Sequence, residues 1–195
     1  MADTNEERRT VSPKVIWLSI MAGLGTLLFG AFIALFIEAL QYRTYYDKFY
    51  KIEIKYPLKW KVVADTSDAI VAFIAPKDDS LDFFRENLNI AVTDNLDEGM
   101  TLEKFSKQMT VQAETALGMN VEILKSEPVI LDGRRAYFYE IQSKGEPEMR
   151  IKSYWYIKDN KAFIITWATD MIHYKQYVKI FNHMVKSLST HDVNE

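Results

Sequence analysis

The residues best suited to acid–base or metal chemistry in this chain are three histidines, His173, His183 and His191. The first two lie ten positions apart in a segment with helical periodicity. A helix would place them about 80° apart in rotation and nearly three turns apart along the axis. We therefore expect no shared metal ion and interpret both as solvated side chains on a helix. His191 falls in a polar C-terminal tail, where fraying is expected.

One acidic loop resembles the start of a calcium-binding loop. Asp78, Ser80 and Asp82 occupy the first three alternating ligand positions. The sixth position is Phe83 where a calcium loop has glycine, and the twelfth is Asn89 where it has glutamate. We expect a solvated turn here, with calcium binding as the alternative. The clustered carboxylates of this loop are Asp78, Asp79, Asp82 and Glu86.

Motifs for catalysis or cofactor binding are missing from the sequence. The chain has no cysteine and only seven glycines, and it contains no nucleophile elbow, Walker loop, HExxH motif or dinucleotide fingerprint. The formal net charge of -3 disfavours nucleic acid as a partner. The sequence therefore predicts a protein that is not an enzyme, with no catalytic residues, no metal site and no cofactor.

A long uncharged segment indicates that a membrane helix precedes the main domain. Val15–Ile37 contains no charged residue, and a helix of that length covers about 35 Å, enough for a hydrocarbon core of about 30 Å. It is longer than the apolar core of a signal peptide, so we expect a retained single-pass anchor. Basic residues are balanced on the two sides. Because long domains translocate largely regardless of charge, we favour a cytoplasmic N-terminus and an extracytoplasmic domain.

Small residues recur every four positions along one face of this predicted helix. Ala22, Thr26, Gly30 and Ala34 form a small-xxx-small ridge, which would allow a second helix to approach closely. The ridge predicts packing against another membrane helix, including a possible dimer. The alternative is that small residues are simply frequent in membrane helices.

Strand patterns dominate the remainder of the chain. We expect strands at 50–56, 60–63, 70–75, 88–93, 121–124, 136–142, 149–157 and 162–168, with helices at 101–117 and from about 171 to 188. The last strands are apolar on both faces, so both faces need cover. The expected fold class is α+β, an α/β/α sandwich around a mainly antiparallel sheet. The predicted segments are a polar tail (1–14), the membrane helix (15–37), a juxtamembrane connector (38–49), one domain (50–189) and a second polar tail (190–195).

Aromatic residues are concentrated on the later strands. Tyrosine combines apolar area with a polar tip, which suits protein interfaces. Core filling is the alternative interpretation. The tyrosines that we consider candidates for a partner-binding face are Tyr137, Tyr139, Tyr154 and Tyr156.

The order and spacing of several short motifs resemble those of the PsbP-like family. The domain opens with 54–60, IKYPLKW, and continues with 73–76, FIAP, and 87–92, NLNIAV. The first long helix opens with 101–105, TLEKF, and the last one closes with 181–188, FNHMVKSL. The resemblance implies an α/β/α sandwich and a mostly non-enzymatic role. That family includes photosystem II extrinsic PsbP, a binding partner of a nuclear-transport GTPase, and bacterial envelope proteins such as DcrB.

These features predict a membrane-anchored accessory or assembly subunit that binds a membrane protein complex. An anchor raises the local concentration of a binding domain near its partner, so a modest affinity suffices. The alternative is an envelope module that binds a small molecule or lipid in a pocket between sheet and helix.

Overall fold

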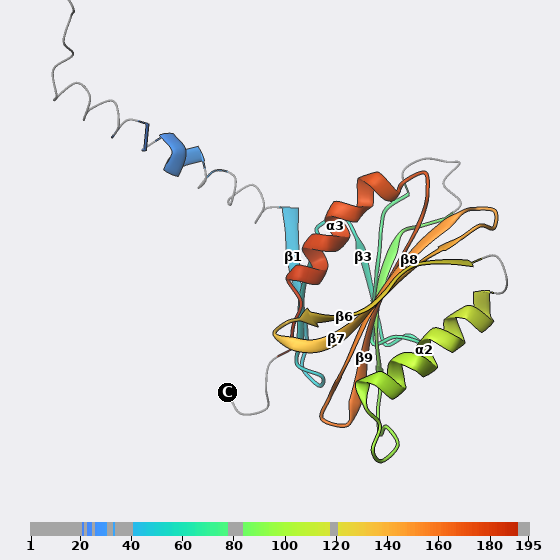
Figure 1. Ribbon diagram of the computed structural model, residues 1–195. Helices are drawn as coiled ribbons and strands as arrows, with labels where there is room; N and C mark the ends of the chain where they lie inside the picture. Colours follow the sequence, from blue (N-terminus) through green and yellow to red (C-terminus); the bar gives the residue numbers. More distant parts are fainter. Residues whose placement is uncertain are drawn as a thin grey trace, which may run out of the picture. The chain divides into compact units, whose positions relative to one another are not determined.

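The protein is described by a computed structural model, which divides the chain into two compact units, Met1–Tyr42 and Arg43–Glu195 (Figure 1). The described residues are 21, 23, 24, 26–30, 33, 41–77, 84–117 and 121–190. In the first unit, the described residues between 21 and 33 are helical. Among all described residues, no helix combines the length and the apolar character needed to cross a membrane. The predicted membrane helix at 15–37 lies largely outside them and stays a prediction.

A seven-stranded sheet forms the centre of the second unit. Every neighbouring pair in it is antiparallel, and the strands follow the order β3-β4-β5-β9-β8-β7-β6. The mainly antiparallel sheet predicted from the sequence is thus confirmed. The strands are β3 (Lys61–Ala64), β4 (Val71–Ile74), β5 (Asn87–Thr93), β6 (Val121–Leu131), β7 (Arg134–Ser143), β8 (Met149–Lys158) and β9 (Lys161–Asp170).

The two helices of this unit cover opposite faces of the large sheet (Figure 1). Strand β9 explains the arrangement, because its side chains alternate between faces. Ile165 and Trp167 pack with Phe181 of α3 (Tyr174–Lys186), whereas Ala162 and Ile164 pack with Phe105 of α2 (Leu102–Leu117). The sheet is therefore apolar on both sides, as the sequence predicted, and each helix buries one apolar face.

Two tight turns set the register of the last four strands. Asp159 and Asn160 adopt positive φ values of 51° and 56° in the two-residue turn between β8 and β9. Asp132 and Gly133 do the same between β6 and β7, with φ values of 49° and 70°. Such turns match the right-handed twist of the flanking strands, so consecutive strands become neighbours.

A second, three-stranded sheet was not expected from the sequence. Its order is β1-β2-β10, formed by Tyr42–Asp47, Ile52–Pro57 and Ser189–Thr190. Strand β1 occupies residues that we had interpreted as a connector, and Tyr45 packs edge-on against Phe73 at 5.7 Å between ring centroids. Burial of this ring explains why a tyrosine-rich segment joins the domain.

Candidate functional site

The four candidate tyrosines lie in two pairs on opposite faces of the large sheet. Tyr137 and Tyr139 pack toward α2 beside Trp155, whereas Tyr154 and Tyr156 pack toward α3. Tyr139 and Tyr156 are buried, and burial raises the pKa of both phenols. The four side chains therefore do not form one continuous surface, and Tyr137 lines an open groove.

That groove runs between helix α2 and strands β6 and β7, and its volume is about 520 Å³. Tyr137 stacks on Trp155 with 5.5 Å between ring centroids and an interplanar angle of 18°. Its hydroxyl lies 2.9 Å from Ser126 Oγ. Val111 of α2 is 54% exposed, so an apolar side chain faces solvent beside the ring. We call this feature the α2–β6 groove, and its lining residues are Glu103, Ser106, Lys107, Thr110, Val111, Glu114, Ser126 and Tyr137.

The tryptophan under Tyr137 is held rigidly. Trp155 is almost completely buried, and its Nε1 donates a hydrogen bond of 2.7 Å to Ser106 Oγ. The same hydroxyl donates to the carbonyl oxygen of Leu102 at 2.6 Å. A buried tryptophan N–H normally needs such a partner. The bond thus connects α2 to β8 beside the groove.

A second polar site lies where β9 leads into α3. It brings together the carboxylates of Glu86 and Asp170 and the imidazole of His173, and we call it the Glu86 cluster. His173 Nδ1 lies 2.9 and 3.0 Å from the two Asp170 carboxylate oxygens and 3.7 Å from Glu86 Oε1. Thr169 donates its hydroxyl to Glu86 Oε1 at 3.3 Å. Two carboxylates and one imidazole are donors that suit divalent metal ions.

Burial dominates the electrostatics of the Glu86 cluster. The Glu86 side chain is 0% exposed, and its desolvation raises the pKa of the carboxyl. The negative charge of Asp170 raises this pKa further, while His173 lowers it. Glu86 Oε2 has no hydrogen-bond partner among the described residues. Buried polar atoms without partners are uncommon and costly.

The sequence did not predict this cluster. We expected Glu86 to be part of a solvated acidic loop, and this expectation is wrong, because Glu86 is fully buried beside Asp170 and His173 at the start of α3. The rest of that loop, 78–83, lies outside the described residues, as does the alternative of calcium binding there. The available signal was the Asp170-x-x-His173 spacing, which gives two donors in one turn. Glu86 is far away in sequence, and only the pairing of β5 with β9 brings it near.

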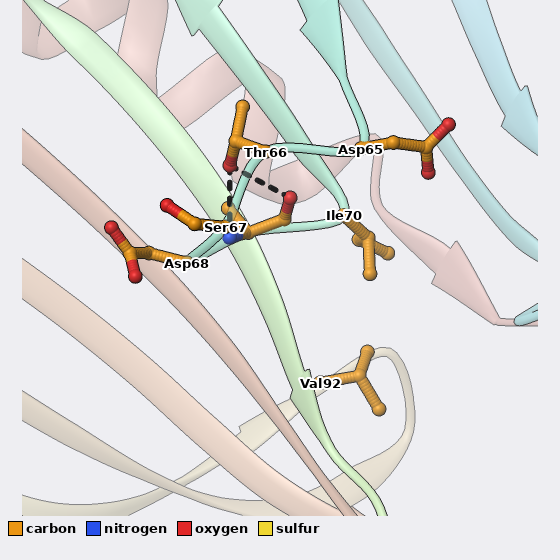
Figure 2. Close-up of a pocket in the computed structure, with 7 residues that line it drawn as sticks. Asp65, Thr66, Ser67, Asp68, Ile70 and Val92 are labelled. Atoms are coloured by element: carbon orange, nitrogen blue, oxygen red, sulfur yellow. Dashed lines mark hydrogen bonds between the residues drawn. The ribbon is translucent and has the colours of Figure 1, made fainter.

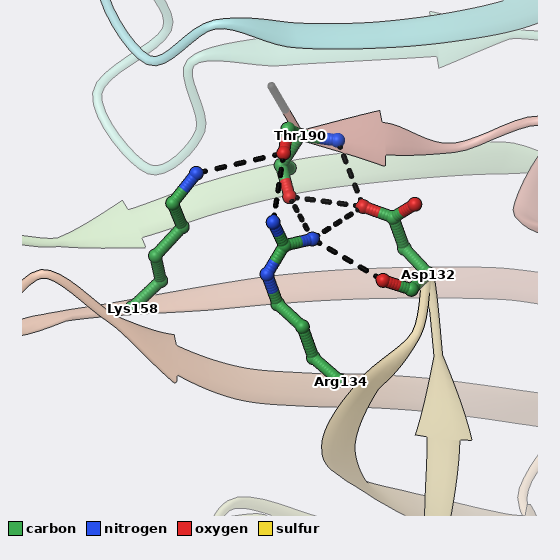
Figure 3. A network of polar contacts seen from close by, with 4 residues as sticks. All are labelled: Asp132, Arg134, Lys158 and Thr190. Carbon is green, nitrogen blue, oxygen red and sulfur yellow. Dashed lines mark hydrogen bonds and ion pairs between the residues drawn. The ribbon is translucent and has the colours of Figure 1, made fainter. Parts of the chain in front are cut away.

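A third polar network fastens the end of the described chain. Arg134 donates from Nη1 to Thr190 Oγ1 at 2.7 Å and from Nη2 to the Thr190 carbonyl oxygen at 2.9 Å (Figure 3). Asp132 accepts from the Thr190 backbone N–H at 2.9 Å and pairs with Arg134 at 2.6 Å. Lys158 reaches the same carbonyl oxygen at 3.5 Å. All of these groups satisfy one another, so we interpret the network as structural.

The hollow at the β3–β4 turn is mainly polar. It encloses about 310 Å³ and is lined by Asp65, Thr66, Ser67 and Asp68, with Ile70 and Val92 among its apolar residues (Figure 2). Thr66 Oγ1 donates to the Ala69 carbonyl oxygen at 2.9 Å and accepts from the Ala69 N–H at 3.0 Å. These bonds close the turn on itself, so they account for its shape without a ligand.

The predicted helix-packing ridge is described only in part. Thr26 and Gly30 are helical and exposed, and Thr26 Oγ1 donates to the carbonyl oxygen of Gly23 at 2.8 Å. Ala22 and Ala34 lie outside the described residues. The prediction of helix–helix packing therefore stays a prediction.

The fold and these sites define a class of small α+β domains in which two helices cover an antiparallel sheet and leave polar side-chain clusters at the helix ends. A family model described as PsbP matches residues 40–190. The chain belongs to the PsbP family. No curated protein matches the sequence at a significant level.

Several solved structures share the fold. Cyanobacterial PsbP (CyanoP) from Synechocystis has 16% identity and a TM-score of 0.58 over 77% of this chain and 93% of its own. LpqN from Mycobacterium tuberculosis, described as involved in cell envelope biogenesis, has 10% identity and a TM-score of 0.56 over 78% and 91%. The Ran-binding protein Mog1p of Saccharomyces cerevisiae has 9% identity and a TM-score of 0.54 over 76% and 95%.

Proposed function

We propose that this chain is a non-enzymatic accessory or assembly subunit that is anchored in a membrane and binds a membrane protein complex through the α2–β6 groove. The observation that carries the proposal is the exposed Val111 beside the stacked Tyr137–Trp155 pair. An apolar centre with a polar rim is the usual anatomy of a protein-binding site. The rim has both signs of charge, from Glu103, Lys107 and Glu114, and so suits a protein surface of mixed charge.

The uncharged segment 15–37 supports the membrane part of the proposal. With a cytoplasmic N-terminus, the PsbP domain would lie on the outer side of the membrane. Two of the structures with the same fold are described as a Ran-binding protein and as a protein of cell envelope biogenesis. A binding role in the envelope is consistent with both descriptions.

The edge of the large sheet is an unfavourable site for a partner strand. Strand β6 ends the sheet, but Pro128 cannot donate a backbone hydrogen bond and the pairing with β7 shifts between Ile123 and Lys125. Irregularity, proline and charge on an edge strand oppose pairing with another chain. A partner would therefore recognise the side chains of the groove rather than the backbone of β6.

Photo-crosslinking in native membranes tests this proposal. A crosslinker at position 111 of the full chain should capture defined membrane subunits at a fixed ratio. The substitution Tyr137→Ala should reduce this capture at least 10-fold, because it removes the ring that forms the floor. A crosslinker at Ile130 is the matched control, since Ile130 is 69% exposed on β6 but does not line the groove. Equal capture from both positions, or no defined subunit from position 111, would contradict the proposal.

A further inference from the structure

We propose that the Glu86 cluster is a binding site for one divalent transition-metal ion, with Zn²⁺ as the best fit. The site uses Glu86, Asp170 and His173 as ligands and is separate from the α2–β6 groove. The proposal rests on three observations: the spacing of the donor atoms, the buried unpaired oxygen of Glu86 and the charge balance of the cluster.

The spacing of the donors is close to that of a metal centre. One donor atom from each residue can be chosen so that all three lie within 4.8 Å of one another. His173 Nδ1 is 2.9 Å from Asp170 Oδ1 and 3.7 Å from Glu86 Oε1. A Zn²⁺ ion with bonds of about 2.0–2.2 Å holds neighbouring ligand atoms about 3–3.5 Å apart. The three side chains would therefore have to draw closer together to bind one ion.

The buried oxygen of Glu86 is the observation that points most directly to a ligand. The carboxyl is 0% exposed, yet Oε2 has no hydrogen-bond partner among the described residues. Thr169 and His173 both lie on the side of Oε1. A buried carboxylate with one unsatisfied oxygen costs free energy unless a cation or a proton compensates it. A metal ion that the Glu86 carboxylate binds through both of its oxygens would compensate Oε2 as well as Oε1.

The charges around the cluster do not neutralise it. With a neutral imidazole, Glu86 and Asp170 carry two negative charges, which one divalent cation would balance. Three basic residues at neighbouring positions, Arg85, Arg150 and Lys152, contact other groups. Arg150 contacts Glu140 at 2.8 Å, and Lys152 lies 3.5 Å from the same carboxylate. Arg85 donates to the carbonyl oxygen of Ala75 at 2.9 Å.

Local structure holds the ligands in place. Asp170 ends β9, and its Oδ1 accepts the backbone N–H of His173 at 2.8 Å, which fixes the turn before α3. Glu86 directly precedes β5, and its carbonyl oxygen accepts the N–H of Ala75 at 2.8 Å. Two of the ligands are thus set by one turn and the third by the sheet. Rigid support of this kind favours a preformed site.

One imidazole and two carboxylates favour Zn²⁺ over calcium or copper(I). Imidazole nitrogen is a preferred ligand for zinc, while calcium prefers six to eight oxygen atoms and copper(I) prefers sulfur. The three protein ligands leave one tetrahedral position for water or for a group from a partner protein. His173 is partly exposed, so an ion has a route to the site.

The test is a Zn²⁺ titration of the full chain in mild detergent after treatment with a chelator, followed by calorimetry and elemental analysis. We expect one ion per chain. Glu86→Gln and His173→Gln should each weaken binding at least 10-fold, because loss of supporting residues alone costs about 10–100-fold. Glu127→Gln and His183→Gln are the matched controls and should bind as the unchanged chain does, since neither residue belongs to the cluster.

Cobalt(II) absorption keeps the test decisive if Glu86→Gln fails to fold. The unchanged chain loaded with Co²⁺ should show visible bands of low-symmetry nitrogen–oxygen coordination, and His173→Gln should lose them. Zn²⁺ should also raise the unfolding temperature of the unchanged chain and not that of His173→Gln. The proposal is overturned if the unchanged chain binds no ion at 1:1 ratio, or if the cluster variants bind as tightly as the controls.

Discussion

Two neighbouring arginines show how burial and geometry determine the contribution of a single residue to stability. Arg134 donates two hydrogen bonds to Thr190 and pairs with Asp132 in a partly buried network. Arg135 pairs with Glu103 at 2.9 Å, but the two side chains are 77% and 65% exposed. Exposed pairs contribute little because water competes for both charges. Sequence alone gives no reason to separate these two residues.

Replacement of Arg134 by lysine should therefore destabilise the domain by about 1–3 kcal/mol, because an ammonium cannot reproduce the two-pronged contact with Thr190. The same change at Arg135 should cost less than about 0.5 kcal/mol. Denaturant unfolding of the two variants, followed by tryptophan fluorescence, measures the difference. Similar midpoints for Arg134→Lys and Arg135→Lys would mean that the Asp132–Thr190 network does not hold β10 in place.

Whether a residue depends on contacts with distant parts of the chain also explains which candidate residues could be identified from the sequence. Tyr137 was selected as a candidate because aromatic residues on adjacent strands suggest an interaction face, and that role stays a prediction. Glu86 was misinterpreted, since its neighbours in the sequence are acidic and its burial depends on β9 and α3. His173 was assigned to a helix surface, although its ring faces Asp170. Residues whose role depends on distant strands cannot be recognised from local pattern.

At the scale of elements, glycine positions test the turns that set strand register. Gly133 has φ of +70° in the β6–β7 hairpin. Gly145 has no positive φ of this kind, and a Cβ added there would lie 3.6 Å from Ser143 Oγ, an ordinary contact. An L-residue in the left-handed region costs about 1–2 kcal/mol. Replacing glycine by alanine also stabilises the folded state by about 0.4–1 kcal/mol, because it lowers the conformational entropy of the unfolded chain. The two terms oppose each other at Gly133 and only the second applies at Gly145.

Gly133→Ala should thus lower the free energy of unfolding by about 0.5–1 kcal/mol, while Gly145→Ala should leave it unchanged or raise it slightly. Thermal unfolding monitored by far-ultraviolet circular dichroism compares the two variants directly. If both alanine variants are equally stable, the β6–β7 turn does not need the left-handed conformation.

Most elements were predictable because their patterns are local. The alternation in β9 and the helical spacing from Leu102 to Leu117 identified both elements. Strand β6 was predicted to be shorter than it is, 121–124 in place of Val121–Leu131. It contains Pro128, which would end a central strand but is tolerated in an edge strand. Strand β1 was interpreted as a connector, although it pairs with β2, the next strand in the sequence. The pairing of β2 with β10, which joins distant parts of the chain, was not predicted at all. Long-range pairing leaves no periodic signal.

At the scale of the whole molecule, the proposed anchor and the proposed binding groove would act together. A domain held near its partner by a short linker experiences an effective concentration in the millimolar range. A groove of about 520 Å³ with mixed charge at its rim suits modest affinity. Tethering would therefore convert weak recognition into stable occupancy. The proposal therefore predicts that neither the membrane segment alone nor the domain alone gives stable occupancy of the partner.

Removal of residues 1–40 should release the chain from membranes and lower the recovery of partner subunits at least 100-fold, because the domain at micromolar concentration loses the millimolar local concentration that the anchor supplies. Extraction of membranes at alkaline pH and quantitative mass spectrometry of crosslinked subunits measure both effects. Strand β1 begins at Tyr42, so the shortened chain keeps all described strands.

A chain whose 15–37 segment is exchanged for an unrelated apolar helix separates the contribution of anchoring from that of specific helix packing. Full recovery would show that anchoring alone suffices, whereas partial recovery would assign specific packing to the ridge that includes Thr26 and Gly30. Partner recovery that is unaffected by the deletion would contradict the tethering mechanism.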